Sequence, residues 1–194
     1  MKIILASGSP RRAEILRAAG FSFEAWAAAV DETPLAGEPA GEYVSRLAET
    51  KARAVADSLG KATEPALVIG ADTVVLADGC ILGKPANVED ARRMLRELSG
   101  RTHDVLTGTA VIRSSDGKTS LHVETTRVWF LSLSAGEIDE YVATGEPSDK
   151  AGAYGIQGIG GRFVSRIEGC YFNVMGLPLS RLWQMLREMG RRSE

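Results

Sequence analysis

Cysteine and histidine are scarce in this sequence, and their scarcity excludes several classes of protein. Two cysteines in 194 residues, Cys80 and Cys170, are too few for a disulfide framework and indicate a reducing, intracellular setting. Two histidines, His103 and His122, are too few for a histidine-rich metal centre. Any metal is therefore expected to be bound by oxygen, which points to Mg²⁺ or Mn²⁺.

Long apolar runs and a strong net charge are also missing. No apolar run approaches the roughly 20 residues that a membrane helix needs. The apolar start of the chain turns polar at Ser7, which is too early for the core of a signal peptide. The formal net charge is −2, so no overall positive field would attract nucleic acid or a membrane surface. We therefore expect a cytoplasmic protein that binds neither nucleic acid nor membrane.

The residues that are present suit a globular α/β protein. A content of 44% hydrophobic and 25% charged residues allows a sizeable core, and the length suits a single domain over residues 1–194. Strand and helix patterns alternate early in the chain, whereas hairpin patterns dominate its middle. This order predicts an α/β fold with a mixed sheet rather than a purely parallel one.

The element boundaries follow from capping residues and periodicity. A helix at 42–59 should bury a stripe that includes Lys51 and Ala54. Ser9, Asn87 and Ser134 are predicted to open three other helices. The expected helices span 11–19, 42–59, 88–98, 134–144 and 178–189. The expected strands span 2–6, part of 21–30, 66–76, 80–82, 105–113, 121–133 and 163–167. A break is expected at 60–65, and irregular structure is expected at 31–41 and 146–161.

A turn of small residues joins the first strand to the first helix. Backbone N–H groups at a helix start attract anions, and the hydroxyls of Ser7 and Ser9 add donors. Arg11 and Arg12 add planar guanidinium groups that suit phosphate. The segment is a candidate phosphate site, but it is not a Walker loop, because the Gly-Lys-Ser/Thr ending of that motif is absent. The plainer interpretation is a capped surface helix with two solvated arginines.

Two lysines are further candidates for phosphate binding. Lys51 lies on the apolar stripe of its helix, so it must extend to solvent, pair with an acid or meet an anionic ligand. Lys84 is held before Pro85, just after a predicted hairpin, where it offers a point charge. Solvated surface lysines are the alternative in both cases.

Two acids are candidates for metal binding and proton transfer. Asp72 follows the buried run Leu67–Gly70, and an acid at the end of a buried strand faces the edge where α/β sheets bind ligands. Such an acid could hold Mg²⁺ or take a proton from water. Glu32, in a loop, would supply a second carboxylate. A capping role in a turn is the alternative for Asp72.

The segment Asp149–Gly158 is rich in small residues, which lets the backbone approach a ligand closely. Gln157 carries an amide that can pair with the edge of a base. Tyr154 and Ile156 argue that this irregular segment is ordered. A long irregular segment in a compact domain is usually either functional or disordered.

Taken together, five segments in order along the chain resemble the motifs of the Maf family. This family consists of nucleoside triphosphate pyrophosphatases, some of them linked to inhibition of septum formation. The resemblance implies a fold similar to that of inosine triphosphatases, with an elongated twisted mixed sheet flanked by helices and a cleft between two lobes. The segments are Leu5–Arg12, Ala71–Val75, Gly83–Pro85, Asp149–Gly158 and Asn173–Pro178.

The resemblance also implies a reaction and roles for single residues. It implies hydrolysis of a nucleoside triphosphate to the monophosphate and diphosphate with Mg²⁺ or Mn²⁺, by a homodimer. Asp72 matches the family's proton acceptor, and the Lys150–Gly158 string resembles the branch that acts on dTTP and UTP. Positions that set the choice of base are matched by Arg12, Thr73 and Gln157, and other polar positions around the cleft by Ser7, Arg11, Glu32, Lys51 and Lys84.

Several alternatives stay open. Spacing does not distinguish attack at the α-phosphorus, which releases pyrophosphate, from attack at the γ-phosphorus, which releases phosphate. Gln157 is compatible with several base edges, so a pyrophosphatase for 7-methyl-GTP, purine or modified-base triphosphates is an alternative. A non-enzymatic nucleotide-binding regulator of cell division is a third hypothesis.

Overall fold

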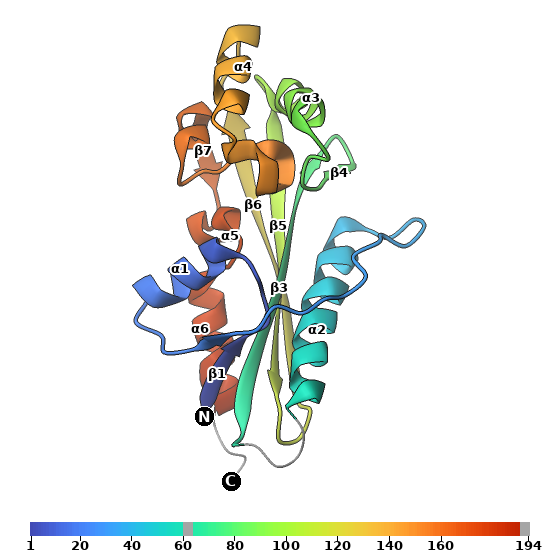
Figure 1. Cartoon of the computed structure of the whole chain (residues 1–194), viewed down its shortest axis with the longest axis vertical. Coiled ribbons are helices and arrows are strands. Elements are labelled where there is room, and N and C mark those ends of the chain that lie inside the picture. The colour runs from blue at the N-terminus through green and yellow to red at the C-terminus, as the bar shows by residue number, and fades with distance from the viewer. Residues whose placement is uncertain (60–63, 191–194) are drawn as a thin grey trace. The chain divides into compact units, whose positions relative to one another are not determined.

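The structure, a computed structural model, describes residues 1–59 and 64–190, which form a mixed α/β fold (Figure 1). One seven-stranded sheet is flanked by helices within these residues, in the order β2-β1-β3-β5-β6-β7, with β4 paired to β3. The strands are β1 (Lys2–Leu5), β2 (Glu24–Ala25), β3 (Ala66–Ala77), β4 (Cys80–Leu82), β5 (Thr102–Arg113), β6 (Thr119–Phe130) and β7 (Val164–Glu168). The helices are α1 (Pro10–Ala18), α2 (Ala40–Ser58), α3 (Val88–Leu98), α4 (Ala135–Ala143), α5 (Tyr171–Met175) and α6 (Leu179–Gly190).

The pairing of the strands confirms the predicted mixed sheet. Strand β1 pairs in parallel with both β2 and β3, as expected where helices connect strands. Strands β3 and β4 form an antiparallel hairpin whose turn residues Asp78 and Gly79 both have positive φ. Strand β7 is antiparallel to β6.

The described chain divides into two compact units. Unit 1 takes Met1–Asp72, Thr107–Glu124 and the segment from Gly176 onward, and unit 2 takes Thr73–Leu106 and Thr125–Met175. Strands β3, β5 and β6 therefore contribute residues to both units. The single domain expected from the length stays a prediction.

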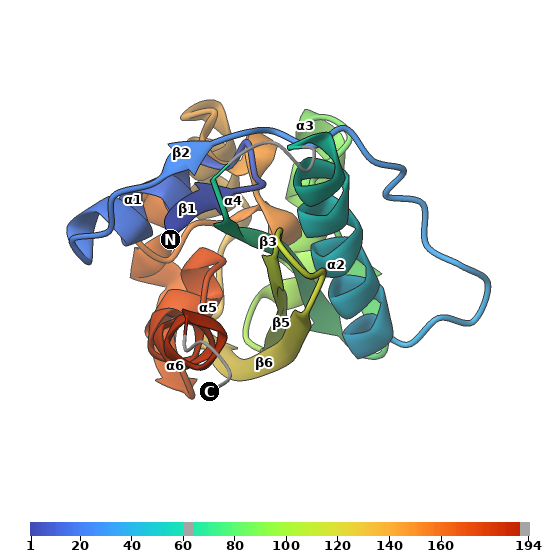
Figure 2. The ribbon, with the colours of Figure 1, turned by 90° about the horizontal axis from the view of Figure 1, so that it is seen from below.

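In unit 1, α2 and α6 lie on opposite faces of the strands (Figure 1, Figure 2). Helix α2 approaches β3 and β5 so closely that only glycine fits beneath it. A Cβ atom on Gly70 would lie 2.1 Å from the carbonyl oxygen of Ala48, and one on Gly108 would lie 2.1 Å from that of Val44. The helix is consequently seated on the sheet at two points along its length.

The predicted buried stripe of α2 is correct except at one position. Lys51 is buried as expected, but Ala54 is exposed and Ala52 is buried in its place. Ala52 lies four residues after Ala48 and so shares its face, whereas Ala54 is turned toward solvent. The core on this face of the sheet comprises Ile4, Ala6, Ala48, Ala52, Val55, Ala66, Val68, Ala110 and Ile112.

Unit 2 has its own core beneath α3 and α4. Both helices begin where the sequence predicts: Asn87 accepts a hydrogen bond from the Asp90 backbone N–H, and Ser134 and Glu137 form a capping box. Aromatic rings of Phe130, Tyr141, Tyr154 and Phe163 pack in this core together with aliphatic side chains.

Other expectations need small corrections. The irregular segment 146–161 is built from short 3₁₀ turns, at Glu146–Asp149, Ala151–Ala153 and Ile159–Phe163. Helix α5 was not predicted, because five residues are too few to show a helical period. Most of the expected break at 60–65 lies outside the described residues.

No helix in the described part of the chain is long and apolar enough to cross a bilayer.

Candidate active site

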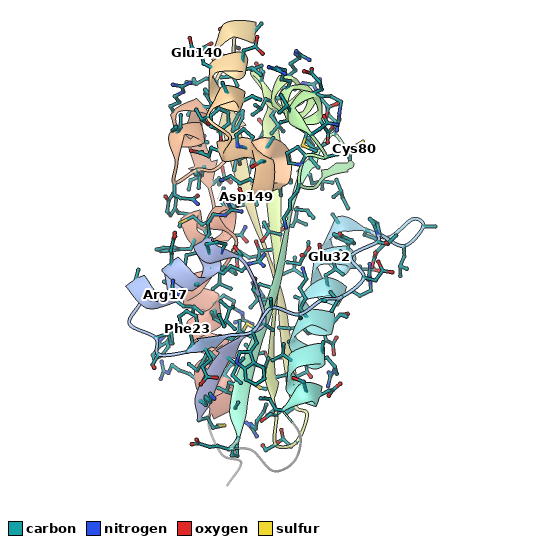
Figure 3. The ribbon with its side chains drawn as sticks, viewed as in Figure 1. Arg17, Phe23, Glu32, Cys80, Glu140 and Asp149 are labelled. Atoms are coloured by element: carbon teal, nitrogen blue, oxygen red, sulfur yellow. The ribbon has the colours of Figure 1, made fainter. Side chains whose placement is uncertain are left out.

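In unit 1, Lys51 bridges two carboxylates. Its Nζ atom lies 2.7 Å from Oδ1 of Asp72 and 2.6 Å from Oε1 of Glu32. Lys51 and Asp72 are each only 8% exposed, whereas the Glu32 side chain is half exposed, on the loop beside α2 (Figure 3). We call these three residues the Lys51 cluster. Of the three outcomes that the apolar stripe allows for Lys51, the structure shows pairing with acids.

The position of Asp72 differs from the sequence-based expectation. Asp72 lies within β3, not at its end, because the hairpin with β4 prolongs the strand to Ala77. The last residue of β1, Leu5, pairs with Ile69 of β3, and the chain after Leu5 leaves the sheet toward α1. Asp72 therefore lies on β3 just beyond the point where its parallel neighbour β1 ends.

Arg12 is buried at the start of α1, and its guanidinium donates hydrogen bonds to Ser7 and Gly176. Its Nη1 donates to Oγ of Ser7 (3.0 Å), and its Nε donates to the carbonyl oxygen of Gly176 (2.8 Å). Burial lowers the pKa of Arg12, the charges of Asp72 and Glu32 oppose this shift, and Arg11 adds to it. The two carboxylates of the Lys51 cluster and the guanidinium of Arg11 therefore all act electrostatically on Arg12.

The turn before α1 is partly as predicted. Pro10 occupies the first turn of the helix and Ser9 precedes it, but the Ser9 side chain makes no capping hydrogen bond. Instead the backbone N–H of Ser9 donates to Oγ of Ser7 at 3.2 Å. Ser7 thus organises both the turn and Arg12, while Arg11 is half-buried beside them.

Tyr43 and Arg46 belong to this site and were not identified from the sequence. The Tyr43 hydroxyl donates to the carbonyl oxygen of Glu32 at 2.9 Å, and Arg46 Nη2 donates to that of Thr33 at 3.2 Å. Arg46 also pairs with Glu38 at 2.6 Å. Burial and the charges of Asp72 and Glu32 raise the pKa of Tyr43. One turn of α2 therefore ties down the loop that carries Glu32.

The remaining predicted residues belong to unit 2. Thr73 is half-buried, whereas Lys84 and Gln157 are exposed. The carbonyl oxygen of Gly83 accepts a hydrogen bond from the Gly152 N–H at 3.1 Å. This bond places the segment before Lys84 against the Asp149–Gly158 segment. Within unit 2, two stretches far apart in sequence are thereby brought together.

Glu32 and Asp72 fit part of a divalent metal site. Both carboxylates reach one ammonium nitrogen, so a single cation could reach both. Among the described residues there is no group of three or more His, Cys, Asp or Glu side chains that could hold a metal. Mg²⁺ is commonly bound through one or two carboxylates, with phosphate oxygens and water completing its shell. The residues present suit a cation that arrives with a nucleotide.

Comparison with known proteins identifies the family. The family model described as "Maf-like protein" matches residues 2–189. The chain is 52% identical to the dTTP/UTP pyrophosphatase of Pelotomaculum thermopropionicum, over 97% of both chains. It is 49% identical to that of Vibrio vulnificus, over 96% of this chain and 98% of the other. It is 50% identical to that of Koribacter versatilis, over 98% and 95%. The chain belongs to the family of Maf-like proteins.

Proposed function

We propose that this chain is a pyrophosphatase that hydrolyses dTTP and UTP to the monophosphate and pyrophosphate. The observation that carries the proposal is the Lys51 cluster, in which the buried carboxylate of Asp72 forms an ion pair with the buried ammonium of Lys51. Relatives named for this activity share about half of their residues with the chain over nearly its whole length, which supports the choice of substrate.

In the proposed reaction Asp72 acts as the general base. A water oxygen forms a bond to the α-phosphorus, its proton passes to the Asp72 carboxylate, and the bond to the bridging oxygen breaks so that pyrophosphate leaves. General-base catalysis by a positioned side chain contributes roughly 10²–10⁴-fold to a rate. Charge neutralisation and positioning supply most of the rest in phosphoryl transfer.

Cations and hydroxyls would hold the triphosphate. Lys51, Arg11 and Lys84 are proposed to bind phosphate oxygens, with Ser7 and Ser9 as hydroxyl donors. Arg12, Thr73 and Gln157 are proposed to select the base, because the resemblance assigns that role to their positions. The fixed guanidinium of Arg12 supports its part, since Ser7 and Gly176 hold it in one orientation.

Glu32 and Asp72 would hold Mg²⁺ or Mn²⁺ together with phosphate oxygens. When bound, the cation would offset the negative charge that develops on the phosphates. Lys51 lies between the same two carboxylates, so it balances their charge before the nucleotide arrives.

A substrate panel tests the proposal. The purified chain is incubated with dTTP, UTP, CTP, GTP, ITP and 7-methyl-GTP, with Mg²⁺ and with EDTA, and pyrophosphate and phosphate are measured separately. We expect Mg²⁺-dependent pyrophosphate release that is fastest for dTTP and UTP. Preference for a purine or 7-methyl-GTP would favour the other pyrophosphatase hypothesis, release of phosphate would indicate attack at the γ-phosphorus, and binding without turnover would favour a regulator.

The homodimer and the cytoplasmic location stay predictions. The chain has a mass of 20.7 kDa, so light scattering during size-exclusion chromatography distinguishes one copy from two. Absence of binding to nucleic acid or to lipid vesicles is likewise expected from the charge balance and is directly measurable.

A further inference from the structure

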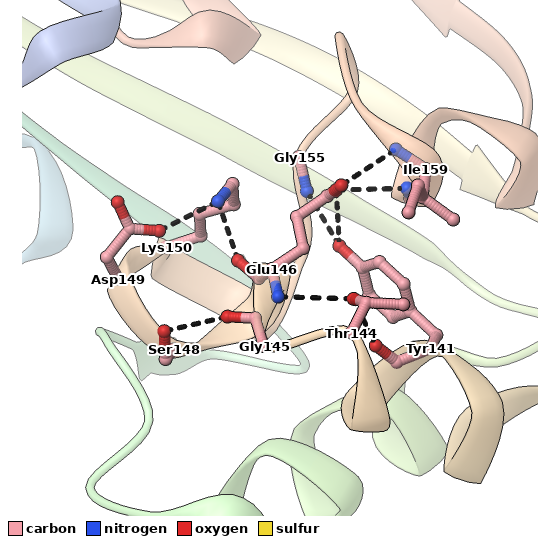
Figure 4. Close-up of polar contacts among 10 residues, drawn as sticks. Tyr141, Thr144, Gly145, Glu146, Ser148, Asp149, Lys150, Gly155 and Ile159 are labelled. Carbon is pink, nitrogen blue, oxygen red and sulfur yellow. Dashed lines mark hydrogen bonds and ion pairs between the residues drawn. The ribbon is translucent and has the colours of Figure 1, made fainter.

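The carboxylate of Glu146 is bound from three sides within unit 2 (Figure 4). Its Oε2 accepts the backbone N–H of Ile159 at 2.9 Å. Its Oε1 accepts the N–H of Gly160 at 3.1 Å and the hydroxyl of Tyr141 at 2.9 Å. Burial opposes the charge of Glu146, but these three donors together hold its pKa below the ordinary value.

Tyr141 adds a contact at Gly155, at the opposite end of the segment Gly155–Gly160 from the contacts of Glu146. Its hydroxyl donates to Glu146 and accepts the backbone N–H of Gly155 at 3.2 Å. The Glu146–Tyr141 pair therefore holds the chain at Gly155 and again at Ile159 and Gly160. Gln157 lies between these anchor points, exposed, and its side chain makes no hydrogen bond with the described part of the chain.

The segment is also packed tightly around Glu146. A Cβ atom on Gly158 would lie 2.6 Å from both carboxylate oxygens, and one on Gly160 would lie 2.6 Å from the Tyr141 hydroxyl. Upstream of Gly155, Lys150 Nζ donates to the carbonyl oxygen of Glu146 (2.6 Å) and pairs with Asp149 (2.7 Å). The backbone on either side of Gln157 is thus held by one carboxylate and its partners.

We propose that Glu146 is a positioning residue that sets where Gln157 presents its amide to the base. This inference rests on the proposed function, since it assumes that Gln157 contacts the base of a nucleotide. Glu146 touches neither base nor phosphate in this account. It acts through the backbone of residues 155–160, because a carboxylate that accepts several N–H groups fixes their positions more firmly than solvent does.

The test compares Glu146→Gln with Glu140→Gln. Glu140 is the exposed neighbour of Tyr141 on α4 (Figure 3), so the control makes the same change of charge away from the anchored segment. For each variant kcat/KM is measured with dTTP and with ITP. We expect Glu146→Gln to lower the dTTP/ITP ratio about tenfold, because the amide nitrogen that replaces one carboxylate oxygen cannot accept a backbone N–H. We expect Glu140→Gln to leave the ratio unchanged.

A double variant distinguishes positioning from general destabilisation. If Glu146 acts through Gln157, then Glu146→Gln should change the ratio by less than about twofold in a Gln157→Ala background. An unchanged ratio in the single variant, including one in which both nucleotides lose activity equally, would overturn the inference. An undiminished effect in the Gln157→Ala background would overturn it as well.

Two further arms keep the test decisive. Should Glu146→Gln lack a cooperative thermal transition, Tyr141→Phe replaces it, since loss of one hydroxyl frees Gly155 and weakens the hold on Glu146. The same fall in the ratio is expected and its absence refutes the inference. A wild-type chain that releases no pyrophosphate refutes the proposed function, and this inference with it. An active wild type with an unaltered ratio in the variants refutes the inference alone.

Discussion

The ammonium of Lys51 lies 2.7 Å from the carboxylate of Asp72, although the two residues are 21 positions apart and belong to α2 and β3. The pair forms because α2 sits directly on β3, where Gly70 leaves room for its backbone. The proposed phosphate-binding cation and the proposed base are thus brought together by the packing of α2 on β3, and several predictions depend on that contact.

Replacement of Asp72 by asparagine should abolish turnover and preserve substrate binding. The amide keeps the size of the side chain but cannot accept a proton, so we expect kcat to fall about 10²–10⁴-fold. Pyrophosphate release measures turnover, and calorimetry with a non-hydrolysable dTTP analogue measures binding. Asp57→Asn, on the exposed end of α2, is the matched control. Near-normal turnover of Asp72→Asn would remove its assigned role.

Lys51→Ala and Lys84→Ala should both raise KM but should differ in stability. Lys51 is buried between two carboxylates, so its loss leaves Asp72 without its cation and should lower the free energy of unfolding by about 1–3 kcal/mol. Lys84 is exposed, and its loss should change that free energy by less than about 0.5 kcal/mol. Urea unfolding and steady-state kinetics check the pair. Unchanged kinetics in both variants would show that neither lysine binds phosphate.

Tyr43→Phe should weaken the reaction without unfolding the chain. The lost hydroxyl holds the carbonyl oxygen of Glu32, so the loop of Glu32 should move and the Mg²⁺ concentration for half-maximal rate should rise about five- to tenfold. A titration of rate against Mg²⁺ measures the shift. Tyr171→Phe, at an exposed position of α5, is the control. An identical Mg²⁺ titration in both variants would count against a positioning role for Tyr43.

His103 should make stability fall in mild acid. Burial lowers the pKa of His103 to about 4 from 6.5, so between these pH values the unfolded chain binds a proton that the folded chain does not. The free energy of unfolding should therefore decrease as pH falls through this window, by up to about 3 kcal/mol from this group. Urea unfolding at several pH values should show a shallower loss in His103→Gln than in the control His122→Gln. Equal slopes in the two variants would contradict this assignment.

The sequence pointed to many candidate site residues through chemistry that depends on few neighbours. The Ser7–Arg12 turn follows from a strand end, small residues and a proline at a helix start. Lys51 was recognisable because a charge on an apolar helical stripe needs a partner. Asn87 and Ser134 begin helices as their side chains predict, since capping is a contact over three residues.

Other features escaped because they depend on contacts distant in sequence. Asp72 was expected at a strand end, yet pairing with β4 extends β3 beyond it. Nothing in the local sequence of Tyr43 indicates that its hydroxyl reaches the Glu32 backbone. The three donors to Glu146 likewise come from α4 and from a segment ten or more residues downstream.

From the order of residues alone follow the mixed α/β class, most helix starts, and the family to which the motifs belong. These depend on periodicity, on capping and on short strings, all of which are local. The partners of Lys51, the orientation of Arg12 and the anchoring of residues 155–160 depend on folding. Each is a hydrogen bond or ion pair between groups from separate elements, and its geometry exists only after burial of the apolar faces has brought those elements into contact.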